Sequence, residues 1–259
     1  MSQISHSQFS PGTFAPWPQR ASIARMICAQ ALIEAKLFLR HGEQQLLSLI
    51  IPAGFLIGLT FIDILGVSDP VSEVFPFSLA LAGMSAGFTG QAIAVAFDRR
   101  YGALKRIGAS GVPSWTIIFG KVVAVLGVAA IQTLILLTLA LVLGWRTNPL
   151  YFLGAIPILI LGVMAFTALG LALGGRLSSE MVLATANLAW FLLLGAAAYA
   201  MFRTGGDPHP MLSIIPSVAF AEAVKAALSG DVAWADIFSL AVWTALASTV
   251  ATKLFRFTM

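Results

Sequence analysis

The sequence predicts an all-α integral membrane protein, and three observations support that fold class. First, only 10% of the 259 residues are charged and 59% are hydrophobic, whereas soluble domains carry about 25% charged residues. Second, several apolar segments have the length, about 20 residues, that a helix needs to cross a bilayer. Third, lysines and arginines concentrate in some of the connecting loops and are rare in the others. We therefore expect six transmembrane helices, an N-terminal amphipathic interfacial helix, a cytoplasmic helix after the second span and an external helical segment before the sixth.

The N-terminal part of the chain is expected to precede the membrane spans. Residues 1–19 are polar and lack the cationic start and apolar run of a signal peptide, so we expect a flexible cytoplasmic tail. Residues 20–43 have the periodicity of an amphipathic helix that lies in the membrane interface, with an apolar arc interrupted by Glu34 and a separate cationic arc. The apolar arc comprises Ile23, Met26, Ile27, Ile33 and Leu37, and the cationic arc comprises Arg25, Lys36 and Arg40.

Residues 44–259 are expected to form a six-span membrane domain. Two polar connections are long enough to contain helices of their own: one at about residues 98–112, and one at about residues 203–231, whose second half has helical character. We expect the part of this second connection from Pro208 to Ser229 to cap the external mouth of the bundle. The apolar segments place the spans at about residues 44–62, 74–97, 115–143, 151–173, 181–202 and 233–254.

The distribution of cations predicts the orientation of these spans. Of the fifteen lysines and arginines, only Arg146, Arg203 and Lys225 fall on the side opposite the N-terminus. Cytoplasmic loops carry the excess of cations in membrane proteins, so we expect both termini in the cytoplasm. The remaining twelve are Arg20, Arg25, Lys36, Arg40, Arg99, Arg100, Lys105, Arg106, Lys121, Arg176, Lys253 and Arg256.

The densest charge lies in the segment FDRRYGALKRIGASGVP, which runs from Phe97 to Pro113. Two interpretations are open. The cations can serve only to fix the orientation of the neighbouring spans. Alternatively, an apolar stripe with cations behind it is typical of a short helix that docks into a groove of another protein. Plotted as one helix, the stripe contains Phe97, Tyr101, Leu104 and Ile107, and the opposite arc contains Asp98, Arg99, Lys105 and Arg106.

This segment, extended to FDRRYGALKRIGASGVPSWTIIFGK, resembles the ABC-2 type exporter permeases, including the daunorubicin-resistance-like group. A second stretch after the fifth span is similar to the same family. The chain departs from the family pattern in two places, since Asp98 is the only carboxylate of the charged cluster and no G-x-x-P follows the late glycine. The matching positions are Gly102, Leu104, Lys105, Arg106, Pro113, Gly120 and Lys121 in the first stretch, and Gly195, Pro216, Glu222 and Ala223 in the second.

The resemblance implies a permease subunit in the bacterial inner (plasma) membrane that exports a hydrophobic or amphipathic substrate, such as a drug, lipid, natural product or glycan. It implies two cytoplasmic P-loop ATPase subunits and a second permease, either another copy of this chain or a sister. The charged segment would be the coupling helix seated on the ATPase, with Tyr101, Leu104 and Ile107 filling its groove, and the interfacial helix would also touch the ATPase. The implied docking residues are Asp98, Arg99, Arg100, Tyr101, Gly102, Leu104, Lys105, Arg106 and Ile107, with Arg25, Lys36 and Arg40 on the interfacial helix.

The sequence offers no catalytic constellation of its own. No Gly-x-x-x-x-Gly-Lys-Ser/Thr motif is present, so ATP and Mg are expected on the partner ATPase and no cofactor on this chain. The three histidines and the single Cys28 lack metal-ligand spacing, and no metal site is expected. The cations flank membrane spans, so we expect contacts with the lipid bilayer and none with nucleic acid.

The residues inside the expected spans help to distinguish an exporter permease from other membrane proteins. Their middles contain no Asp, Glu, Lys or Arg, which disfavours an ion-coupled secondary carrier because such carriers keep ionisable relays at membrane depth. A membrane scaffold that docks a cytoplasmic protein without transport also stays open. The neutral polar residues of the spans can line a substrate path or form hydrogen bonds between helices. They are Gln91, Gln132, Thr185 and Asn187.

Glycines four positions apart recur in three of the expected spans. Small residues at this spacing let helix backbones approach closely. They predict packing sites within the bundle or, alternatively, a seam between two copies of the chain. The pairs are Gly54 and Gly58, Gly83 and Gly87, and Gly170 and Gly174.

Overall fold

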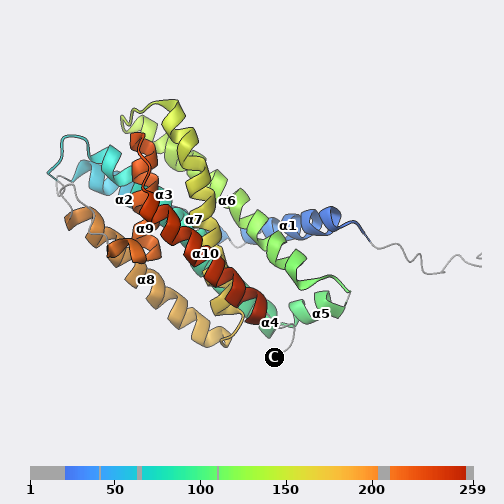
Figure 1. Ribbon diagram of the computed structural model, residues 1–259. Coiled ribbons are helices and arrows are strands. Elements are labelled where there is room, and N and C mark those ends of the chain that lie inside the picture. Colours follow the sequence, from blue (N-terminus) through green and yellow to red (C-terminus); the bar gives the residue numbers. More distant parts are fainter. Residues whose placement is uncertain (1–20, 41, 63–65, 110, 204–210, 255–259) are drawn as a thin grey trace, which may run out of the picture.

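The computed structural model describes residues 21–40, 42–62, 66–109, 111–203 and 211–254 (Figure 1). Over these ranges the chain is all helical and contains no strand. The tail expected at residues 1–19 lies outside them. The elements are α1 (Ile23–Arg40), α2 (Gly42–Phe61), α3 (Pro70–Met84), the π-helical turn η1 (Ser85–Thr89), α4 (Gly90–Arg100), α5 (Ala103–Ala109), α6 (Ser114–Val142), α7 (Pro149–Gly174), α8 (Ser179–Arg203), the 3-10 turn η2 (Leu212–Ile214), α9 (Pro216–Ser229) and α10 (Trp234–Leu254).

Five helical segments are long and apolar enough to cross a membrane, counting the described residues only. Each coincides with an expected span to within a few residues. The first expected span corresponds to α2, whose apolar stretch Ser48–Phe61 is shorter than the roughly 20 residues of a full crossing. The segments that qualify are Pro70–Arg100, Trp115–Val142, Pro149–Gly174, Ser179–Met201 and Trp234–Lys253.

Two of the glycine pairs bring the segment α3–η1–α4 into close contact with α7. A Cβ atom at Gly170 would lie 2.5 Å from the carbonyl oxygen of Phe88, and one at Gly174 would lie 2.3 Å from that of Ala92. A Cβ at Gly87 would lie 2.9 Å from the backbone nitrogen of Thr167. The expectation that these pairs are packing sites is therefore confirmed, because no side chain fits between the two backbones.

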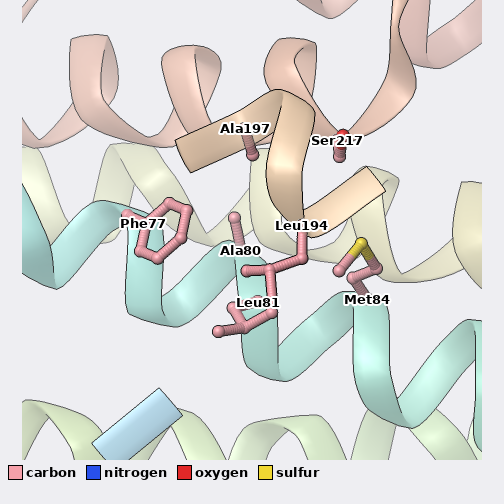
Figure 2. Close-up of a pocket in the computed structure, with 7 residues that line it drawn as sticks. All are labelled: Phe77, Ala80, Leu81, Met84, Leu194, Ala197 and Ser217. Carbon is pink, nitrogen blue, oxygen red and sulfur yellow. The ribbon is translucent and has the colours of Figure 1, made fainter. Parts of the chain in front are cut away.

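Helix α9, which lies in the connection expected to be external, is a buried element of the bundle. It packs against α3, α7, α8 and α10 (Figure 1), and the Phe220 ring lies over two glycines, where a Cβ at Gly162 would come within 2.1 Å of it and one at Gly83 within 2.9 Å. Figure 2 shows Ser217 of α9 above the contact of Leu194 of α8 with α3, where a cavity of only about 10 Å³ remains. The helix is thus inserted between spans, and the expectation that this connection caps the external mouth stays a prediction.

The connections sort into two ends of the bundle. At the end that we call the basic end, α4 meets the α7–α8 turn through hydrogen bonds from Arg99 and Arg100. At the opposite, acidic end, Thr147 donates to the Leu228 carbonyl, and Lys225 pairs with Glu73. The basic end carries Arg99, Arg100, Lys105, Arg106, Arg176 and Lys253, and the acidic end carries Asp69, Glu73, Asp231 and Asp236.

Candidate functional site at the basic end

The charged segment contains parts of two helices. The expectation of a single helix over residues 98–112 is therefore wrong. Helix α4 ends at Arg100, and α5 begins at Ala103. Gly102 between them has φ +70°, and Gly111 after α5 has φ +75°. Glycine adopts this left-handed conformation without the steric cost that other residues meet, so the two glycines turn the chain at both ends of α5.

The inner face of α5 is fixed to the bundle by Leu104. Its side chain is 1% exposed and packs in a small apolar cluster, with Ile107 at the edge of that cluster. We expected Leu104 to fill a groove on a partner protein. This expectation is wrong, because the side chain is buried in the chain's own core. The other buried members are Val95 of α4, Ile117 of α6, Leu171 of α7 and Ala251 of α10.

The outer face of α5 remains open to solvent. We use the name α5 outer face for Tyr101, Lys105 and Arg106, all of which are exposed. The Tyr101 side chain is 67% exposed and its ring stacks on Phe97 with a centroid distance of 5.9 Å. Arg106 donates from Nη2 to the Tyr101 carbonyl at 3.0 Å, which holds the turn together. The two cations therefore project from α5, and Tyr101 from the turn before it, while the other side of α5 is packed against the bundle.

Arg99 and Arg100 turn toward the chain's own α7–α8 connection. Nη1 of Arg99 donates to the carbonyl oxygens of Gly174 at 3.1 Å and Leu177 at 3.2 Å, so it satisfies one carbonyl at the end of α7 and one in the turn that follows. Nη1 of Arg100 donates to Ser179 Oγ at 3.0 Å and pairs with the Glu180 carboxylate. Both cations, expected on a partner-docking surface, join two spans of the same chain.

A buried ion cluster joins three helices at this end. Lys121 of α6 is fully buried, and its Nζ lies 2.6 Å from Glu34 Oε1 of α1 and 2.8 Å from Asp98 Oδ2 of α4. Gln30 also donates to Glu34 Oε1 at 2.8 Å. Desolvated charges persist in a protein when they are paired and hydrogen-bonded. This cluster was not predicted, although Glu34 on an apolar arc and a lysine inside a span are both signals that a partner is required.

Helix α1 can reach this cluster because α6 presents a glycine to it. A Cβ atom at Gly120 would lie 2.6 Å from Cγ and 2.7 Å from Cβ of Gln30. The expected cationic arc faces away from α6, with Arg25 and Lys36 exposed, while the side chain of Arg40 lies outside the described residues. Apolar side chains of the opposite arc are also exposed, as an interfacial helix requires. They include Ile23, Ile33 and Leu37.

The four polar residues considered for a substrate path do not form one cluster of contacts. Gln132 is buried, and its Nε2 donates to Ser48 Oγ of α2 at 2.9 Å, a bond between helices. Thr185 and Asn187 donate to carbonyls of their own helix α8. Gln91 is buried, and its Oε1 has no hydrogen-bond partner among the described residues.

Acidic side chains gather around Lys225 at the other end. Glu73 of α3 pairs with Lys225 of α9, and Glu222 lies one turn before that lysine. Burial raises the pKa of the Glu222 carboxyl, the nearby Asp236 and Glu73 charges raise it further, and Lys225 opposes the shift. Glu222 therefore gains a proton more readily than a free glutamate.

The fold and the basic end define a class of protein: an all-helical, multi-pass membrane protein with a basic two-helix connection after the α3–α4 span and no nucleotide-binding motif in its sequence. A family model described as ABC-2 family transporter protein matches residues 63–254. The chain belongs to that family and is a permease subunit of the ABC transporter class. Comparison with curated proteins gives no match.

Proposed function

We propose that the chain is the permease subunit of an ATP-driven exporter in a bacterial inner membrane, with both termini in the cytoplasm. It would move a hydrophobic or amphipathic substrate outward, paired with a second permease and two ATPase subunits that hold ATP and Mg. Family membership and the apolar helices support the permease role. The excess of cations at the basic end supports a cytoplasmic location for that end.

The observation that carries this proposal is the two-sided character of α5. Its inner residue Leu104 is packed among α4, α6, α7 and α10, whereas the α5 outer face carries exposed cations and Tyr101. A partner that binds the outer face can displace α5 only by moving those four helices with it, since packed interiors transmit strain. In this proposal Asp98, Arg99 and Arg100 position the helix, and Tyr101, Lys105 and Arg106 contact the ATPase.

Helix α1 would move together with α5 and the four helices that pack against Leu104. The Lys121 cluster ties α1 to α4 and α6 through two short ion pairs. Arg25 and Lys36 remain exposed on α1 and would supply a second contact with the ATPase. A push on α5 would then reach the interfacial helix as well as the spans.

Site-specific photo-crosslinking tests the docking face. A photoreactive residue at position 105 should capture a chain that contains a P-loop motif when the protein is expressed in its native membrane. The matched control is position 253, an exposed lysine at the same end on α10. Equal capture from both positions, or capture of a P-loop chain from position 146 at the acidic end, would overturn the proposal.

ATP turnover distinguishes the alternatives. In the reconstituted complex, replacing Lys105 and Arg106 with glutamate should abolish substrate-stimulated ATP hydrolysis while the permease still inserts, and Lys253→Glu should leave it intact. Transport that follows an ion gradient without ATP would identify a secondary carrier. A captured partner whose ATP turnover no substrate changes would identify a scaffold.

A further inference from the structure

A cavity of about 430 Å³ opens at the basic end, between the end of α4 and the α7–α8 turn. We call it the arginine pocket. Its polar lining comes from three arginines, two serines and one glutamate, and with one carboxylate among three guanidinium groups the pocket carries a net positive charge. These residues are Arg99, Arg100, Arg176, Ser178, Ser179 and Glu180.

The three arginines retain donors that the chain does not use. Arg99 is held in place by two carbonyls through Nη1, yet its Nε is buried and has no partner among the described residues. The Arg176 side chain is exposed and forms no hydrogen bond or ion pair with the described part of the chain. An arginine fork presents parallel N–H donors that match two oxygens of a phosphate.

The start of α8 adds to this preference for an anion. Helix α8 has 25 residues, and Ser178 caps it by accepting from the Met181 backbone nitrogen at 3.4 Å. Free backbone N–H groups and the helix dipole make such an end attractive to negative charge. The Glu180 carboxylate, paired with Arg100, already occupies part of this environment. It is two-thirds exposed, so it can move aside for a stronger anion.

The location of the pocket identifies the source of the anion. One candidate span ends at Arg100, a second ends at Gly174, and a third begins at Ser179. The pocket therefore lies at the level where the bilayer's hydrocarbon gives way to phosphate headgroups. Basic pockets between transmembrane helices bind the headgroups of anionic lipids.

We propose that the arginine pocket binds the phosphate of an anionic phospholipid headgroup. Arg176 and Arg99 supply the charge-assisted hydrogen bonds, and Glu180, paired with Arg100, is the carboxylate that competes with the ligand for the positive charge of the pocket. This site is separate from the α5 outer face, so the inference does not depend on the proposed function. Lipid binding here would fix the angle between the α4 end and the α7–α8 turn.

Native mass spectrometry of the purified full-length chain tests this, with dioleoylphosphatidylglycerol and dioleoylphosphatidylcholine as the two probes. The wild-type chain should retain phosphatidylglycerol preferentially. Arg176→Gln should lower that affinity by about tenfold or more, the effect of losing one charge-assisted hydrogen-bonding group. Lys253→Gln removes the same charge at the same end but outside the pocket, and it should leave the preference unchanged. Glu180→Gln should increase the affinity, because it removes the competing carboxylate.

Each other outcome contradicts the proposal. Equal retention of the two lipids by the wild-type chain, or an equal loss in Arg176→Gln and Lys253→Gln, would show only non-specific attraction to the basic end. Displacement of phosphatidylglycerol by millimolar inorganic phosphate would assign the pocket to a free phosphate compound and overturn the lipid assignment. The thermal midpoint of each variant in phosphatidylcholine confirms folding, and Arg176→Lys, which keeps the charge but loses the fork, should give an intermediate affinity.

Discussion

The Lys121 ammonium lies 2.6 Å from the Glu34 carboxylate, although the two residues are 87 positions apart in the sequence. Lys121 lies in a span, whereas Glu34 lies in the N-terminal helix α1. This pair holds α1 against α6 by charge, and the pair between Lys121 and Asp98 ties α6 to α4. Because Lys121 has no exposure to solvent, the whole cost of desolvating it must be offset by these two partners.

Replacement of Lys121 by methionine should destabilise the protein strongly. The change leaves the Glu34 and Asp98 carboxylates close together without their cation, and breaking a buried pair in this way costs about 3 kcal/mol or more. The thermal midpoint of the purified protein measures the effect. The triple variant Lys121→Met, Glu34→Gln, Asp98→Asn should recover most of the loss. No recovery would show that the lysine contributes mainly by packing.

The close approach of α1 to α6 predicts a second effect. Gly120→Ala places a Cβ atom within 2.7 Å of two Gln30 carbons, so the helices must separate, at a cost of about 1–3 kcal/mol. Gly127→Ala on the same helix is the matched control, because nothing lies within 4 Å of its added Cβ. Proteolysis after α1 should accelerate in the first variant only. Similar rates in both would argue against tight α1–α6 packing.

The insertion of α9 is tested at Gly162. Gly162→Ala would put a methyl group 2.1 Å from the Phe220 ring, and overpacking of this kind costs about 1–3 kcal/mol. Phe220→Leu should partly rescue that variant, since it withdraws the ring, while the rescue should be absent with Gly154→Ala, where the added Cβ meets open space. Additive effects of Gly162→Ala and Phe220→Leu on the thermal midpoint would contradict the contact.

The raised pKa of Glu222 predicts a pH dependence of stability. The folded state binds this proton more tightly than the unfolded state does, so the contribution is fully present below the unfolded value of 4.5 and is lost as pH rises through the folded pKa. The thermal midpoint should therefore rise as pH falls from about 8 toward about 5. Glu222→Gln should raise the midpoint at pH about 8 and flatten its pH dependence. An unchanged slope would show that another group titrates.

The spans could be predicted because a bilayer imposes their length and apolarity on the local sequence. The fourth span, expected at about residues 151–173, is α7 at Pro149–Gly174. The sequence shows a glycine at position 102. Plotting the charged segment as one continuous helix could not predict that the chain turns there. Leu104 was predicted on a surface that docks a partner, but it packs inside the chain. Periodicity identifies an apolar face but does not identify what covers that face.

The sequence by itself determined where the membrane helices run and that cations gather on one side of them, since both follow from composition over short stretches and from the cost of charge in hydrocarbon. Only the tertiary structure decided which of those cations form hydrogen bonds or ion pairs within the chain. Lys121, Arg99 and Arg100 are bound by groups that helix packing brings from distant parts of the chain, whereas Lys105 and Arg176 are not enclosed by the packed helices and stay exposed. The physical reason is that a cation can pair only where helix packing brings an acceptor from another part of the chain next to it.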